Sequence, residues 1–192
     1  MILFFYFLFA YCTGNILFGF IISKFLANKD IRKEGSRNAG ARNAGRLYGK
    51  KAFIFTFFGD ALKGAFIVYL GRLLGYSTSI LLLGLLFACA GHIKPIFFQW
   101  KGGKGISSFI GGMITIQPIF IFIILAAFLL FYLIYRSFTV PGLLSLAACC
   151  VSFLFLEESL ASFFIATMLM AMIVLSHNIP LRHFIQKKSN DN

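Results

Sequence analysis

The sequence predicts an all-helical integral membrane protein, because of its composition, the positions of its charges and the length of its apolar segments. Hydrophobic residues make up 59% of the 192 positions, 26 residues are phenylalanine and the mean hydropathy is +0.87. Only 12% of the residues are charged, and they cluster between long apolar segments. A soluble protein of this size has too small a core to bury so much apolar surface. We expect one polytopic membrane domain over residues 1–192.

The apolar segments predict seven transmembrane helices, some of them short. Five are expected at Ile2–Phe25, Ala52–Leu74, Ser79–Ala90, Val140–Leu156 and Ser159–Ile179. Between the third and fourth of these, the apolar stretch from Gly105 to Tyr135 is too long for one span of about 20 residues. Gln117-Pro118 interrupts it, so we expect two short helices there. In the second span, Asp60 and Lys63 lie three residues apart and can pair on one helix face.

The positions of lysine and arginine predict the topology. Of these 18 cations, all except Lys63 and Arg72 fall on one side of the membrane if the N-terminus is outside and the C-terminus is cytoplasmic. A count of six spans would leave the basic tail outside, against the excess of positive charge on cytoplasmic segments. Cations gathered in loops suit membrane-lipid headgroups or phosphorylated substrates, so we expect no nucleic-acid partner.

The strongest candidate site is the polar stretch from Gly91 to Ser108, GHIKPIFFQWKGGKGISS. Lysines can neutralise an anion there while glycines let backbone amides approach it. The residues of these two kinds are Lys94, Lys101, Lys104, Gly102, Gly103 and Gly105. A helix that begins near Gly105 would direct the positive end of its dipole at the same anion. The pattern predicts a phosphate site, although a tight loop with snorkelling lysines has the same composition.

Two further polar stretches are predicted on the same face of the membrane. The first, GSRNAGARNAGR from Gly35 to Arg46, has the glycines and small polar residues of turns, and we expect no helix there. The second, SHNIPLR from Ser176, ends the last span. Taken alone, each also fits a basic loop or a helix cap. His92 fits either a base or a hydrogen-bonding structural residue.

Together, these stretches resemble the motifs of the bacterial membrane glycerol-3-phosphate acyltransferases that use acyl-phosphate as donor, the PlsY family. The resemblance covers essentially the whole chain. GHIKPIFFQWKGGKG is close to the family's GHxxPxFxxFKGGKG, and DALKG from Asp60 matches its second span. The first motif, usually GSGNxGATNxxR, has Arg37 in place of glycine and Arg42 in place of threonine. The third motif, usually HxxNIxRL, is altered to SHNIPLRHF.

The resemblance implies seven spans, with the motif loops and the active site on the cytoplasmic face of the bacterial inner membrane. It implies transfer of a fatty acyl group from acyl-phosphate to glycerol 3-phosphate, giving lysophosphatidic acid and phosphate for phospholipid synthesis. We expect neither a cofactor nor a metal. Catalytic roles are expected for Ser36, Arg46, Lys104 and Asn178. Substrate-binding roles are expected for Asn38, Arg42, Asn43, His92, Lys101, Gly102, Gly103 and His177.

Two alternatives stay open on sequence alone. A transporter of a phosphorylated metabolite would carry polar residues along its spans and often paired repeats, whereas these spans are nearly bare. A catalytically idle relative that scaffolds lipid-synthesis partners would fit Arg37, Arg42 and the altered third motif. For the enzyme, we expect the acyl chain in a groove between Phe-rich helices. Glu34 is the only carboxylate beside a motif, so we expect direct attack by the acceptor hydroxyl without a carboxylate base.

Overall fold

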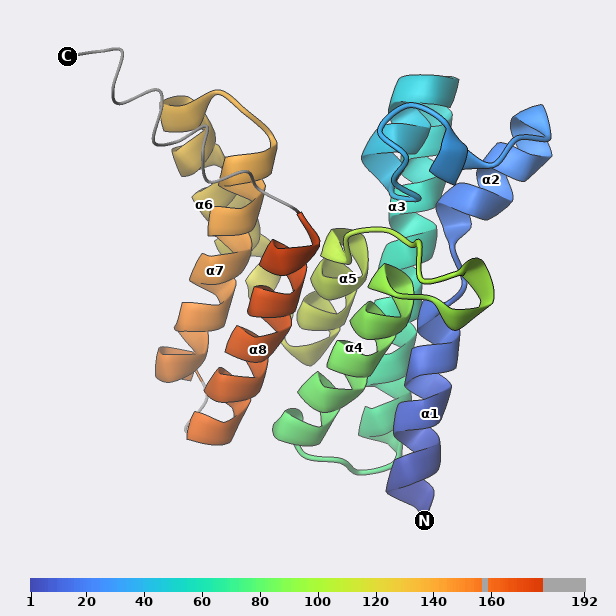
Figure 1. Cartoon of the computed structure of the whole chain (residues 1–192). Coiled ribbons are helices and arrows are strands. Elements are labelled where there is room, and N and C mark those ends of the chain that lie inside the picture. Colours follow the sequence, from blue (N-terminus) through green and yellow to red (C-terminus); the bar gives the residue numbers. More distant parts are fainter. Residues whose placement is uncertain (157–158, 178–192) are drawn as a thin grey trace.

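The computed structural model describes residues 1–156 and 159–177, and this part of the chain is helical without a strand (Figure 1). The N-terminus lies at one end of the helix bundle and the end of the last helix lies at the other. The α-helices are α1 (Ile2–Gly14), α2 (Phe18–Ala27), α3 (Ala41–Leu73), α4 (Thr78–Ile93), α5 (Ile106–Ile116), α6 (Phe120–Tyr135), α7 (Thr139–Leu156) and α8 (Leu160–Ser176). Two short 3-10 helices, η1 (Ile31–Lys33) and η2 (Ile96–Phe98), lie in the loops.

The predicted seven-span architecture is confirmed, and the chain is a multi-pass membrane protein. Four segments are long and apolar enough to cross a membrane, namely Ile2–Ala27, which joins α1 and α2, Ala41–Leu73, Thr78–Phe98 and Thr139–Leu156. The shorter apolar helices α5, α6 and α8 bring the described segments to seven. As expected, α5 and α6 are separated at Pro118. With 11 residues, α5 is about 16 Å long, or about half of a hydrocarbon core.

The first span, predicted over Ile2–Phe25, is found over Ile2–Ala27, but it is divided into two helices where one was expected. α1 ends at Gly14 and α2 begins at Phe18. This break frees backbone carbonyls inside the protein, and the Lys63 ammonium donates to two of them, Gly14 O at 3.0 Å and Ile16 O at 2.6 Å. Lys63 also pairs with Asp60 at 3.0 Å, as predicted. A partner from another helix makes the break tolerable, because water is not available there to satisfy the carbonyls.

α3 begins at Ala41, so the prediction that Gly35–Arg46 contains no helix was wrong for its second half. Gly40 is extended (φ −88°, ψ 167°) and starts the helix, and Ala41 and Ala44 favour its first turns. Helical geometry is interrupted at Gly49, where φ is 85° and ψ is −178°. No atom lies within 4 Å of a Cβ built at Gly49, so the backbone conformation, and not lack of space, requires glycine there.

Small residues let the helices that carry the site approach closely. α3 packs on α5 where a Cβ at Gly64 would lie 2.0 Å from the Ser108 carbonyl oxygen, and one at Gly111 would lie 2.0 Å from that of Ala61. Apolar helices surrounded by lipid gain little from hydrophobic burial against each other, so close van der Waals packing of this kind holds them together. The contact places the start of α5 beside the middle of α3.

α8 lies between α4 and α7, and its last turn ends near the loops that carry the predicted motifs (Figure 1). The main core includes Phe109 of α5, Phe120 of α6 and Phe153 of α7, with the rings of the last two 5.0 Å apart. Large apolar side chains also face outward, such as Phe155 at 83% exposed. Outward apolar groups are expected on a surface that contacts lipid.

Candidate active site

The first motif forms a loop that is organised by the buried amide of Asn43. Its Nδ2 donates to the carbonyls of Ile31 (3.3 Å), Glu34 (3.0 Å) and Asn38 (3.0 Å). Its Oδ1 accepts from the Ser36 backbone N–H at 2.9 Å. Both amide atoms of Asn43, predicted as a substrate ligand, are therefore used within the loop. The side chain of Ser36 is left exposed and that of Asn38 is half-buried.

The second motif forms a loop that lies directly on His92. The Gly103 N–H donates to the His92 carbonyl at 3.0 Å. A Cβ at Gly102 would lie 1.9 Å from the His92 carbonyl oxygen, so no residue larger than glycine fits at position 102. His92, predicted as a substrate ligand, is buried under it, whereas Lys101 is exposed and Lys104 is half-buried. α5 begins immediately afterwards at Ile106, as predicted from the motif.

Arg32 and Ala39 join the first two loops. The guanidinium of Arg32 donates to the Phe98 carbonyl at 2.8 Å and is held by both carboxylate oxygens of Asp30, at 2.9 Å and 2.7 Å. It also lies over the rings of Phe20 (5.3 Å) and Phe98 (5.0 Å). Hydrogen bonding from Arg32 holds the pKa of Asp30 below its ordinary value. The Ala39 N–H donates to the Gly102 carbonyl at 3.4 Å, so the two motifs form one surface.

The end of α8 meets the second loop beside Lys104. The Ser176 hydroxyl lies within donating distance of the carbonyls of Ile173 (2.6 Å) and Lys104 (3.2 Å). His177 Nδ1 bonds the Ile173 carbonyl at 2.8 Å. Burial lowers the pKa of His177, and the nearby Lys104 ammonium lowers it further. Asn178, predicted as catalytic from the third motif, lies outside the described residues.

Positive or ionisable groups from three separated segments interact here, namely those of Arg42, Lys104 and His177. Burial lowers the pKa of Lys104, and the guanidinium of Arg42 lowers it further. Arg42 itself reaches away from α3, donating to Thr139 Oγ1 at 2.9 Å and lying 5.9 Å from the Phe138 ring. Arg46 is exposed one turn farther along α3. Cations held close together in this way favour binding of an anion, which relieves their mutual repulsion.

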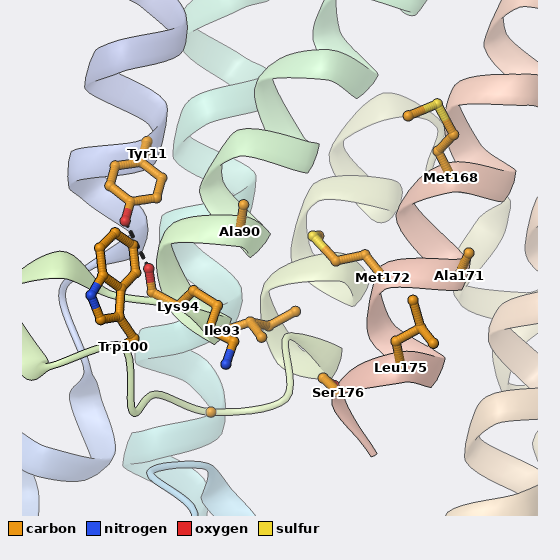
Figure 2. A pocket seen from close by; sticks show the side chains of 11 residues that line it. Tyr11, Ala90, Ile93, Lys94, Trp100, Met168, Ala171, Met172, Leu175 and Ser176 are labelled. Atoms are coloured by element: carbon orange, nitrogen blue, oxygen red, sulfur yellow. Dashed lines mark hydrogen bonds between the residues drawn. The ribbon is translucent and has the colours of Figure 1, made fainter. Parts of the chain in front are cut away.

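An apolar groove of about 620 Å³ reaches Gly103 and Ser176, the sequence neighbours of Lys104 and His177 (Figure 2). It lies mainly between α4 and α8, and its apolar lining is Ala90, Ile93, Trp100, Met168, Ala171, Met172 and Leu175. Its polar end is formed by Lys94, Gly103 and Ser176, and the Tyr11 hydroxyl closes one side by donating to the Lys94 carbonyl at 2.7 Å. The groove was expected between Phe-rich helices, and its lining contains no phenylalanine. An elongated apolar group can lie here with a polar head at the loops.

Sequence reasoning missed two residues that assemble this site, Arg32 and Ser176. Arg32 was counted only as a topology-setting cation, and its sequence neighbourhood contains no sign that it bonds a loop 66 residues away. Ser176 is the first residue of the third stretch, SHNIPLR, but no role was predicted for its hydroxyl. No local pattern identifies either contact, since each depends on which helix ends are adjacent in the folded chain.

The comparisons with known proteins agree with this geometry. Residues 4–187 match the family model described as glycerol-3-phosphate acyltransferase. The chain is 43% identical over 171 residues to "Glycerol-3-phosphate acyltransferase 1" of Bacillus cereus, covering 89% of this chain and 94% of that protein. It is 31% identical over 181 residues to "Glycerol-3-phosphate acyltransferase" of Clostridioides difficile, covering 92% of this chain and 88% of that protein.

Solved structures show the same fold. The crystal structure of PlsY (YgiH), an integral membrane glycerol 3-phosphate acyltransferase, in its glycerol 3-phosphate form, superposes with a TM-score of 0.87 and 27% identity, over 97% of this chain and 94% of that one. Its lysophosphatidic acid form superposes with a TM-score of 0.85 and 26% identity, over 97% and 93% of the two chains.

Proposed function

The chain belongs to the glycerol-3-phosphate acyltransferase family, and we propose that it uses acyl-phosphate as the donor and acylates the sn-1 hydroxyl of glycerol 3-phosphate. The products are lysophosphatidic acid and inorganic phosphate. The observation that supports this most is the apolar groove whose polar end, at Gly103 and Ser176, adjoins Lys104 in sequence, because the donor has an apolar tail and a phosphate head. The related PlsY structures are a glycerol 3-phosphate form and a lysophosphatidic acid form. These two molecules are the acceptor and the product of the proposed reaction.

The acyl chain lies in the groove between α4 and α8, and its carbonyl lies at the polar end near Gly103 and Ser176. Lys104 neutralises a substrate phosphate from the floor of the site, where partial burial strengthens its charge interaction relative to bulk water. Lys101, Arg42 and Arg46 add cations from the exposed rim. An arginine can hold two phosphate oxygens at once with its planar guanidinium.

The reaction is direct acyl transfer. The sn-1 hydroxyl oxygen attacks the carbonyl carbon of acyl-phosphate, a new ester C–O bond forms, and the bond from that carbon to the phosphate oxygen breaks. The departing phosphate takes the hydroxyl proton, so no carboxylate base is needed. Lys104, Arg46 and backbone amides of the glycine loop stabilise the charge that develops on the carbonyl oxygen and the leaving group. Ser36 and Asn178 orient the acceptor hydroxyl, which removes much of the entropic cost of bringing two substrates together.

The catalytic surface faces the cytoplasm of a bacterial cell, at the inner membrane, and residues 1–192 act as a single domain. Alternation of seven spans puts the loops of the first and second motifs and the end of α8 on one side. The excess of lysine and arginine in these segments favours the cytoplasmic side. Family membership favours this enzyme over the transporter considered from sequence alone.

The test is phosphate release from acyl-phosphate by the purified protein, with and without glycerol 3-phosphate. Release that depends on the acceptor, together with formation of lysophosphatidic acid, is the expected result. Stable acyl-phosphate in the presence of acceptor would identify the chain as an idle relative. Reversible loss of activity on chelation would refute direct acyl transfer by the residues named above.

A further inference from the structure

A buried triad of ionisable side chains, Asp60, Lys63 and His92, lies beneath the second motif loop and has no part in the chemistry described above. Asp60 is 1% exposed, Lys63 4% and His92 3%. Lys63 Nζ lies 3.0 Å from Asp60 Oδ1 and 2.7 Å from His92 Nδ1. Charged groups within a membrane-spanning bundle are costly and are kept where they have a specific task.

Lys63 determines which nitrogen of His92 carries a proton. An ammonium group has three N–H donors and no acceptor. Two of these donors face the carbonyls of Gly14 and Ile16, at 3.0 Å and 2.6 Å, and the third side of the group faces Asp60 and His92. Because Lys63 can only donate to His92 Nδ1, this nitrogen accepts, and the proton of the neutral ring lies on Nε2.

The opposite edge of the same ring supports the glycine loop. A Cβ at Gly103 would lie 2.0 Å from His92 Nε2, so the loop backbone rests directly against this protonated edge. The His92 carbonyl accepts from the Gly103 N–H at 3.0 Å. The next residue is Lys104, whose own carbonyl lies 3.2 Å from the Ser176 hydroxyl. A rotation of the His92 ring would therefore displace Gly103 and Lys104 together.

We propose that Lys63 and Asp60 are positioning residues for acyl transfer, which hold His92 in one tautomer and orientation and thereby hold the Gly102–Lys104 loop in its phosphate-binding geometry. Lys63 is suited to this task because one ammonium joins the broken first span, α3 and α4 at a single point. Asp60 keeps that ammonium charged at a buried position, where an unpaired charge would be unfavourable. The inference rests on the proposed role of Lys104 at the substrate phosphate.

The test compares wild type with Lys63→Met, with the charge-balanced pair Asp60→Asn plus Lys63→Met, and with His92→Asn, in the phosphate-release assay. We expect kcat/KM to fall by about 10- to 100-fold in each folded variant, since a displacement of about 1 Å in a catalytic group has effects of this size. Part of this fall in kcat/KM is expected as a higher KM for a phosphorylated substrate. The charge-balanced pair removes both ions, so it avoids leaving Asp60 buried without a partner.

A double-mutant cycle separates positioning from general destabilisation. Gly103→Ala forces the loop away from His92, so in combination with His92→Asn, which shortens the side chain, its effect on kcat/KM should be much smaller than in wild type. Thr56→Val is the matched control, because it removes a buried hydroxyl from the same helix and should leave both kinetic constants within about twofold.

Three results would overturn the proposal: unchanged KM with only a lower Tm in the triad variants, full additivity of Gly103→Ala and His92→Asn, or equal losses in Thr56→Val. Wild-type protein that releases no phosphate would instead refute the proposed function. Wild-type turnover with unaffected triad variants would refute this inference alone.

Discussion

Arg42 differs from the threonine that is usual at this position of the family motif, and Arg42→Thr restores that residue. Among the differences from the motif, this one has the clearest expected effect on substrate binding. The guanidinium is exposed, bonds Thr139 Oγ1 at 2.9 Å and lies near enough to Lys104 to lower its pKa. We therefore expect it to contribute to binding of one substrate phosphate across the rim of the site. Exposed charge interactions contribute about 0.2–1 kcal/mol, so KM should rise about 1.4- to 5-fold.

The pH dependence gives a second, independent measurement on the same variant. Arg42 disfavours the protonated form of Lys104, so its removal raises the pKa of Lys104 towards the ordinary value. The alkaline limb of kcat/KM should move to higher pH in Arg42→Thr, because Lys104 then keeps its proton longer. High salt should weaken the difference in KM between wild type and variant, since it screens exposed charges.

Two control variants isolate the charge. Arg42→Lys keeps a cation and should keep most of the affinity, whereas Thr139→Val removes only the hydrogen-bond partner and should leave KM within about twofold. The reasoning would be refuted by an unchanged KM and an unchanged alkaline limb in Arg42→Thr. Activity that rises tenfold or more on this substitution would show that Arg42 is inhibitory.

Three further predictions concern the phosphate site, the groove and the topology. Lys104→Ala should lower kcat/KM by about 10- to 150-fold, because a half-buried charge-assisted contact contributes about 1.5–3 kcal/mol; steady-state kinetics equal to wild type would contradict the assignment. Ala171→Trp should fill the groove and weaken binding of a long-chain donor by about 0.8 kcal/mol for each displaced methylene. The measurement is KM as a function of acyl-chain length, and Ala161→Trp, elsewhere on α8, should leave it unchanged. In a background with Cys12 replaced by serine, a cysteine at Lys33 should label only from the cytoplasmic side and one at Ser77 only from outside; the reverse pattern would exclude the proposed orientation.

Features that depend on local composition and spacing were predictable. Apolar segment length predicted seven spans, and Pro118 predicted the separation of α5 and α6 because proline cannot donate the backbone hydrogen bond that a continuing helix needs. The three-residue spacing of Asp60 and Lys63 predicted their ion pair. The motif residues also predicted the family, which the comparisons confirmed. The roles of individual site residues remain predictions.

Features that depend on contact between distant segments were not predictable. The first span looked continuous because its residues are apolar throughout, yet Lys63 from another helix makes a break there tolerable. Gly35–Arg46 looked irregular because its glycines and asparagines usually form turns. In the folded chain, the Asn43 amide bonds the carbonyl of Glu34 in the preceding loop, and α3 begins at Ala41.

By itself, the sequence determined that the protein spans a membrane repeatedly and that its cations gather between the spans, since hydropathy and charge are properties of each segment alone. Only the tertiary structure decided that α4 and α8 form an apolar groove, that Arg42 reaches Thr139 and that His92 supports Gly103. These pairings depend on how closely small residues let particular helices approach. Many sequences of equal hydropathy would pack their helices differently.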